Sequence, residues 1–225
     1  MISETYNTDC LEAMREMPDK AFDLAIVDPP YGIERSGQKL SVNNANPKHN
    51  RKYFEDKGWD SAIPSIEYFA EIRRVSRNQI IWGGNYFTEH LPASRGWCVW
   101  DKGQEGLSMS DGELAWTSFD VPLRRKTLNR GILNIEGTIH PTQKPVALYK
   151  WLLTNYAKQG DTILDTHLGS GSSRIAAHDL GFDFTGYELD KDYFTAQEER
   201  FKRHIAQPNM FAPEPIIETQ EAFSF

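Results

Sequence analysis

The chain has 225 residues, of which 39% are hydrophobic and 25% are charged, so it holds enough apolar material for one packed domain. Its mean hydropathy is −0.58, and no stretch approaches the roughly 18 apolar residues of a membrane span, so we expect no membrane-spanning helix. Residues 1–15 have neither a basic start nor an apolar run, so we expect no secretory signal and a cytoplasmic location. Cys10 and Cys98 form no Cys-x-x-Cys pair, which argues against a disulfide framework and against a metal site.

The net charge of −7 is unevenly distributed. Residues 34–58 and residues 120–130 each carry a local charge of +3, whereas residues 206–225 contain three acids and no Lys or Arg. Two basic segments in an acidic chain are compatible with a polyanionic partner and equally compatible with ordinary solvated surface.

Short apolar runs alternate with longer segments of helical period, which is typical of an α/β sheet. The pattern predicts strands at 24–27, 79–82, 97–100, 114–117, 162–164 and 184–187. It predicts helices at about 11–17, 65–75, 145–156, 172–180 and 191–205. We expect one domain over 1–206, with a basic loop at 34–58 and an insert at about 102–139, followed by an acidic, proline-containing tail at 207–225.

The predicted strand at 24–27 runs directly into Asp28-Pro29-Pro30-Tyr31. Neither proline can donate a backbone hydrogen bond, so the strand must end there, and the stiff backbone holds the Asp28 carboxylate and the Pro29 carbonyl at fixed angles. Ligands of open α/β sheets bind at this carboxyl edge. Two rigid oxygens suit both N–H groups of an exocyclic amine, and Tyr31 can stack on the base that carries it. The alternative is an ordinary strand-terminating turn.

The predicted strand at 162–164 ends in a glycine loop, Asp165 to Ser173, and the next strand ends at Glu188. Glycines at 169 and 171 allow a tight turn and a close approach to a ligand before a helix begins. A carboxylate 23 residues after Asp165 is placed to accept hydrogen bonds from ribose hydroxyls. Because Arg174 follows the two serines, a nucleoside with an amino-acid tail fits better than a dinucleotide.

Asp28-Pro29-Pro30-Tyr31 resembles the catalytic motif of the S-adenosylmethionine-dependent DNA amino-methyltransferases, which methylate adenine N6 or cytosine N4. In that family the acidic residue and the first proline carbonyl bind the target amine, and the aromatic residue stacks on the flipped base. The resemblance implies that these four residues are catalytic and that S-adenosyl-L-methionine is the cofactor. It also implies a Rossmann-like fold with a mostly parallel sheet flanked by helices.

The glycine loop resembles the family motif Asp-Pro-Phe-x-Gly-Ser-Gly, with Thr166 and His167 in place of Pro and Phe. Residues 140–145, His-Pro-Thr-Gln-Lys-Pro, resemble the segment that holds the methionine end of the cofactor, where Lys144 is suited to a carboxylate. Residues 8–11 resemble the segment that contacts its adenine, although Asp9 is equally suited to cap a helix. The implied cofactor site comprises Asp9, Cys10, Asp28, His140, Thr142, Lys144, Asp165, His167, Leu168, Gly169, Ser170, Gly171, Ser172, Glu188 and Leu189.

The order of these motifs resembles the β group of the family, in which target recognition lies between the catalytic and cofactor parts. The resemblance therefore implies a site-specific DNA methyltransferase, of the kind found in restriction-modification, that acts on adenine N6 by direct displacement. Cytosine N4 is the alternative, disfavoured because N4 enzymes more often have Ser at the position of Asp28. A relative that binds cofactor or DNA without activity is a further alternative, and RNA or protein-glutamine methylation is disfavoured by the same Asp28.

DNA is the predicted partner, with a base extruded from the duplex into the site. The candidates for phosphate contacts are Arg35, Lys48, Arg51, Lys52, Arg124, Arg125, Lys126 and Arg130. Because the insert at 102–139 is short, a short target, relaxed specificity or sharing of recognition across a homodimer would each fit.

Overall fold

A computed structural model of the chain describes residues 1–40, 52–105 and 110–207. Within these residues a sheet holds eight strands in the order β1-β8-β7-β2-β3-β5-β4-β6. The strands are β1 (Ser3–Tyr6), β2 (Phe22–Val27), β3 (Ser76–Trp82), β4 (Trp97–Asp101), β5 (Gly112–Thr117), β6 (Arg124–Thr127), β7 (Thr162–Asp165) and β8 (Asp183–Tyr187). The helices are α1 (Cys10–Glu16), α2 (Ile66–Val75), α3 (Ile132–Glu136), α4 (Val146–Tyr156), α5 (Ser172–Asp179) and α6 (Lys191–Ala206), with a 3-10 turn η2 (Gly84–Tyr86).

Most strands of the sheet are parallel. Strands β1, β8, β7, β2 and β3 run in one direction, β5 runs antiparallel to both β3 and β4, and β4 pairs in parallel with β6. The expected α/β fold with a mostly parallel sheet between helices is confirmed. All six predicted strands and all five predicted helices form, with ends that differ by at most three residues.

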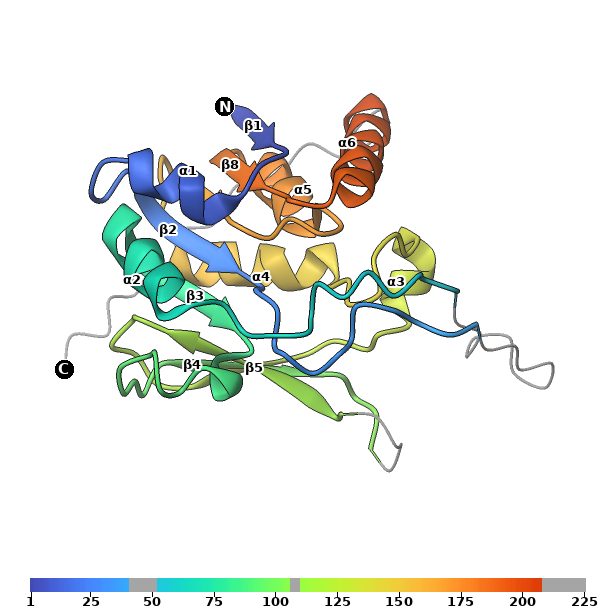
Figure 1. Cartoon of the computed structure of the whole chain (residues 1–225), viewed down its shortest axis with the longest axis horizontal. Helices are drawn as coiled ribbons and strands as arrows, with labels where there is room; N and C mark the ends of the chain where they lie inside the picture. The colour runs from blue at the N-terminus through green and yellow to red at the C-terminus, as the bar shows by residue number, and fades with distance from the viewer. Residues whose placement is uncertain (41–51, 106–109, 208–225) are drawn as a thin grey trace.

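The sheet lies between two helical layers because its central strands are apolar on both faces. On β2, Leu24 and Ile26 point to the face covered by α4 and α5, whereas Ala25 and Val27 point to the face covered by α1 and α2. These four side chains are at most 1% exposed. Figure 1 shows β2 running between these two helical layers toward the carboxyl edge of the sheet. The double burial fixes the direction in which β2 delivers the residues that follow it.

Three elements do not follow from the sequence pattern. Strands β1 and β6 have the sequences SETY and RRKT, which lack the apolar alternation of a half-buried strand. Each forms at an edge of the sheet, where a strand pairs on one side only and its side chains stay largely in solvent. The short helix α3 is likewise unpredicted. Strands β5 and β6 lie inside the expected insert at 102–139, so part of that segment belongs to the main sheet.

Two helix starts shift by one residue for a local reason. Ser65 is not the first residue of α2 but its N-cap, because its hydroxyl accepts a hydrogen bond from the backbone N–H of Tyr68. Pro145 likewise precedes α4, which begins at Val146.

Candidate active site

The two motif-bearing strand ends are neighbours in the sheet. Strands β2 and β7 pair in parallel, with Leu24 opposite Ile163 and Ala25 opposite Leu164. Asp28 follows the last residue of β2, and Asp165 is the last residue of β7. Parallel neighbours end at the same edge, so the Asp28 motif and the glycine loop share one side of the sheet although 137 residues separate Asp28 from Asp165 along the chain.

The Asp28 carboxylate is held by two side chains. Its Oδ2 accepts a hydrogen bond from the Lys144 ammonium at 2.5 Å, and its Oδ1 accepts one from the Tyr31 hydroxyl at 2.5 Å. Burial raises the pKa of Asp28, and the Lys144 charge opposes that rise. Pro29 is buried beside it. The carboxylate is therefore fixed in orientation at the end of β2.

Lys144 uses all three of its N–H donors. Besides Asp28, it donates to the Tyr31 hydroxyl at 3.1 Å and forms an ion pair with Glu113 of β5 at 3.1 Å. Glu113 is paired in turn with Lys102, just after β4, at 2.8 Å. The sequence motif suggests a cofactor carboxylate as the partner of Lys144, and it gives no indication of Glu113 or Lys102. No local signal marks either residue, because only the folded sheet brings β5 next to residue 144.

The Tyr31 ring is packed between other aromatic residues. It stacks on Tyr86 of η2, with ring centroids 5.0 Å apart and planes 15° apart, and meets Phe87 edge-on at 6.1 Å. Gly83 allows this position, because its φ is +71° and a Cβ there would lie only 2.2 Å from the Tyr31 ring. The Tyr31 ring is thus held in a fixed plane by Gly83 and by two neighbouring aromatic residues.

Asp60 fixes the backbone that follows Pro30. Its buried carboxylate accepts hydrogen bonds from the backbone N–H groups of Tyr31 at 2.6 Å, Gly32 at 3.0 Å and Arg35 at 2.8 Å. This residue was missed by the sequence reading, since an isolated Asp in a charged loop has the appearance of solvated surface.

Asp165 and Glu188, the two predicted acids, both accept hydrogen bonds from residues of the glycine loop. Asp165 accepts hydrogen bonds from the Ser173 hydroxyl at 2.5 Å and the His167 backbone N–H at 3.0 Å, and burial raises its pKa to about 7. Glu188, at the end of β8, accepts the Gly169 N–H through Oε2 at 2.8 Å. Gly169 and Gly171 have φ of +49° and +70°, the left-handed region that favours glycine.

Thr166 and His167 form a polar link where the family has Pro and Phe. The Thr166 hydroxyl lies 2.7 Å from the Tyr68 hydroxyl of α2 and 3.0 Å from His167 Nδ1. The His167 ring meets the Tyr68 ring edge-on at 5.4 Å, and burial lowers the His167 pKa to about 4. His167 is therefore neutral near pH 7, so its ring remains suited to pack against an uncharged aromatic group.

The His140 ring packs against Gly169 of the glycine loop. Its ring atoms lie 3.5 Å from the position of a Cβ on Gly169, and it packs against Trp59 at 5.2 Å and Tyr193 at 4.4 Å. Burial lowers the His140 pKa to about 3. Thr142 contacts His140 Nδ1 through its hydroxyl at 3.2 Å.

The remaining cofactor candidates take different positions. Asp9 is the N-cap of α1 and accepts the Leu11 N–H at 2.7 Å, which is the capping alternative, and Cys10 begins that helix. Leu168 lies in the core, whereas Leu189 is 69% exposed. The Ser170 and Ser172 hydroxyls contact each other at 3.0 Å, and both residues are bound by Arg200.

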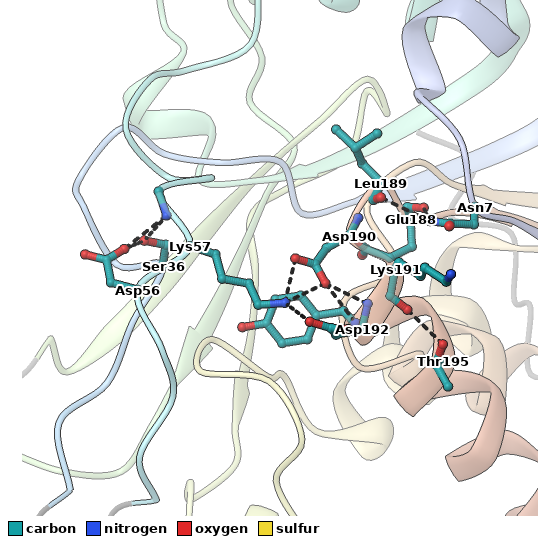
Figure 2. A network of polar contacts seen from close by, with 12 residues as sticks. Asn7, Ser36, Asp56, Lys57, Glu188, Leu189, Asp190, Lys191, Asp192 and Thr195 are labelled. Carbon is teal, nitrogen blue, oxygen red and sulfur yellow. Dashed lines mark hydrogen bonds and ion pairs between the residues drawn. The ribbon is translucent and has the colours of Figure 1, made fainter.

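The basic segments are only partly free to meet a partner. Lys57 forms ion pairs with Asp190 at 2.8 Å and Asp192 at 2.7 Å, which tie residues 52–60 to the start of α6 beside Glu188, as Figure 2 shows. The Lys52 ammonium donates to the Thr138 carbonyl at 2.9 Å.

Lys48 and Arg51 lie outside the described residues. Arg35, Arg124 and Arg125 are exposed, Lys126 and Arg130 are half-buried, and Arg125 lies 3.8 Å from Asp101.

Comparison with known proteins shows what this chain is similar to. The sequence profile of the DNA methylase family, which covers N6 and N4 enzymes, matches residues 99–199. The chain is 22% identical to the type II methyltransferase M.HinfI of Haemophilus influenzae, over 89% of this chain and 68% of that protein. It is also 22% identical to M.HpaI of Haemophilus parainfluenzae, over 86% and 72%. Residues 99–199 therefore match the DNA methylase family, and most of the chain is similar to type II DNA methyltransferases.

Solved structures share the fold of this methyltransferase. The M1.HpyAVI–SAM complex superposes with a TM-score of 0.61 at 20% identity, covering 89% of this chain and 99% of the other. The cytosine-N4-specific PvuII DNA methyltransferase superposes with a TM-score of 0.58 at 14% identity, covering 96% and 91%. Family members use S-adenosylmethionine as methyl donor. Among residues 1–40, 52–105 and 110–207, the methyltransferase has no helix long and apolar enough to cross a membrane.

Proposed function

We propose that this methyltransferase transfers the methyl group of S-adenosyl-L-methionine to the exocyclic N6 amine of an adenine at a specific site in DNA. The observation that carries the proposal is the Asp28-Pro29 oxygen pair at the end of β2, directly beside the strand that leads into the glycine loop. An amine held by the Asp28-Pro29 oxygen pair would face a cofactor held by the glycine loop.

The residues around the glycine loop fit S-adenosylmethionine. Each Glu188 carboxylate oxygen accepts one backbone N–H, from Asp190 at 2.9 Å and Gly169 at 2.8 Å, which leaves a lone pair on each oxygen for a ribose hydroxyl. The neutral ring of His167 suits the flat adenine of the cofactor, and the left-handed glycines keep side chains out of the loop. When bound, the cofactor would supply a methyl group carried on a sulfonium sulfur. The sulfur would be left as a neutral thioether once the methyl group is transferred.

Asp28 and Pro29 prepare the amine for attack. The lone pair of a base amine is delocalised into the ring, which makes it a poor nucleophile. Hydrogen bonds from its two N–H groups to an Asp28 oxygen and the Pro29 carbonyl favour a tetrahedral nitrogen with a localised pair. The carboxylate also stabilises the positive charge that develops on nitrogen, and Asp28 Oδ1 can accept the proton released as the N–C bond forms.

Tyr31 provides the stacking surface for the base. Tyr86 lies parallel to the Tyr31 ring, with ring centroids 5.0 Å apart, and so fixes the plane in which a base would stack. Stacking of this kind contributes about 1–3 kcal/mol per base. Lys144 and Asp60 hold the Tyr31 hydroxyl and backbone N–H, so its orientation is set before a base arrives.

The exposed arginines of β6 are the favoured phosphate contacts. Arg124 and Arg125 lie on the edge strand β6, within the segment that separates the catalytic motif from the glycine loop. DNA binding through such side chains weakens steeply as salt concentration rises. Asp28 favours adenine over cytosine, because the N4 enzymes more often have Ser at that position.

Tritiated methyl transfer to a panel of duplex DNA substrates, followed by nucleoside analysis, tests the proposal. We expect label in N6-methyladenine at a defined sequence, and loss of label in Asp28→Ala. Label in N4-methylcytosine would overturn the choice of base. Binding of cofactor or DNA with no transfer at any enzyme concentration would identify an inactive relative instead.

A further inference from the structure

Four side chains of alternating charge form a continuous line behind the catalytic carboxylate. Asp28 contacts Lys144 at 2.5 Å, Lys144 contacts Glu113 at 3.1 Å, and Glu113 contacts Lys102 at 2.8 Å. The four residues come from the end of β2, the approach to α4, strand β5 and the residue after β4. The sheet therefore assembles the line from segments that are distant in sequence.

The line is buried and electrically balanced. The Lys144 side chain is only 2% exposed, and those of Lys102, Asp28 and Glu113 are also largely withdrawn from water. A buried charge without a partner is costly, and removing one member of a buried pair strands the other. Two acids and two bases cancel, so a line of this length can be buried where a single Asp28–Lys144 pair would leave Lys144 with an unused donor.

Glu113 competes with Asp28 for the Lys144 ammonium. Burial alone would raise the pKa of Glu113, but Lys144 and Lys102 outweigh burial and lower it to about 2, so Glu113 is anionic at every pH of interest. The negative charge of Glu113 is paired with the same Lys144 ammonium that neutralises Asp28. Lys102 in turn shares the Glu113 charge and limits that competition.

We propose that Glu113 and Lys102 are positioning residues for methyl transfer, which act through Lys144 to set the orientation and the effective charge of the Asp28 carboxylate. The inference rests on the proposed function and extends it to two residues that contact neither the base nor the cofactor. Without Glu113, Lys144 would bind Asp28 alone, and the carboxylate would become a weaker acceptor for the amine.

The expected shifts have opposite signs. The Glu113 charge raises the pKa of Asp28, so Glu113→Gln lowers it and moves the acid limb of the rate profile to lower pH. Lys102→Gln leaves Glu113 a stronger competitor for Lys144, so the limb moves to higher pH. We expect kcat of Glu113→Gln to fall about 10- to 100-fold because the carboxylate is misplaced. Glu113→Asp keeps the charge and should retain the position of the limb.

Other titratable groups couple to Asp28, and the experiment must separate them. Tyr31, Tyr68 of α2 and Tyr149 of α4 all have a pKa raised well above 10 by burial, so they stay neutral. Asp165 of β7 titrates near pH 7. Because Asp165 belongs to the cofactor loop, single-turnover rates at saturating S-adenosylmethionine remove most of its contribution through binding.

The test compares single-turnover rates from pH 4 to 9 in wild type, Glu113→Gln, Glu113→Asp and Lys102→Gln. Glu198→Gln is the matched control, because its side chain is 24% exposed against 25% for Glu113 and pairs with Arg174 at 2.5 Å. Opposite shifts in Glu113→Gln and Lys102→Gln, with no shift in Glu198→Gln, support the inference. An unmoved acid limb in Glu113→Gln overturns it, even where kcat falls.

A carbon-13 NMR titration of the Asp28 carboxyl measures the pKa of Asp28 without turnover. The Asp28 signal is assigned by its loss in Asp28→Asn. If wild type transfers no methyl group, the proposed function fails, while the titration still decides whether Glu113 controls Asp28. Thermal unfolding of each variant identifies any that fail to fold, in which case Lys102→Gln and the titration carry the decision.

Discussion

Asp60 offers the sharpest test of how the segment proposed to be catalytic, Asp28 to Tyr31, is held in place. Its carboxylate, 2% exposed as a residue, accepts three backbone N–H groups, two on Oδ1 and one on Oδ2. In Asp60→Asn the amide oxygen can keep the bonds to Tyr31 and Gly32. The amide nitrogen then faces the Arg35 N–H, so two donors oppose each other and that hydrogen bond is lost.

The magnitude follows from these contacts. Loss of one charge-assisted hydrogen bond, with weakening of two others, costs about 1.5–3 kcal/mol of unfolding free energy. For a chain of this size that corresponds to a fall in melting temperature of about 3–12 °C. Asp60→Ala removes all three bonds and should destabilise further. Because the Tyr31 backbone loosens, we also expect KM for DNA to rise, with little change in the affinity for S-adenosylmethionine.

Differential scanning calorimetry and methyl-transfer kinetics measure both effects. Asp120→Asn is the matched control, since it also neutralises an aspartate, but one whose side chain is 88% exposed beside Arg95, where little change is expected. An Asp60→Asn variant with the melting temperature and KM of wild type would refute the role assigned to this carboxylate.

Three further predictions concern the proposed site directly. Asp28→Ala should lower methyl transfer at least about 100-fold with the circular dichroism spectrum unchanged, and near-full activity would show that Asp28 is not the amine acceptor. Glu188→Ala should mainly weaken cofactor binding, measured by calorimetry, and unchanged affinity would remove Glu188 from the ribose role. Burial raises the pKa of Asp165 from near 4 to about 7, so its contribution to stability is present at low pH and is lost as pH rises through that interval. Urea unfolding of Asp165→Asn should therefore show stability rising relative to wild type between pH 4 and 7, and parallel profiles for the two proteins would contradict the raised pKa.

The strand ends were predictable because their signals are local. The apolar run of β2 and the two prolines after it lie within ten residues, and the glycine loop after β7 is equally compact. Strand pairing then brings these short patterns to one edge. The edge strands β1 and β6 escaped prediction because a strand that is paired on one side needs little apolar surface.

The supports of the site could not be predicted from the sequence. Glu113, Lys102 and Asp60 have meaning only through contacts with residues 11 to 31 positions away, and in the sequence they look like ordinary surface charges. Lys57 shows that a local excess of positive charge does not reveal which side chains are free, since this lysine of the basic loop is paired with Asp190 and Asp192. Buried polar contacts of this kind depend on the complete fold.

The pairing of β2 with β7 makes the geometry of the site depend on the register of these two strands. Neighbouring strands lie about 4.8 Å apart, so their ladder sets the distance between the two halves of the site. A register slip of β2 by a single residue would displace Asp28 by about 3.3 Å and turn its side chain to the opposite face. Substitutions at Leu24 or Ala25 that disturb this ladder should therefore impair catalysis before they unfold the protein.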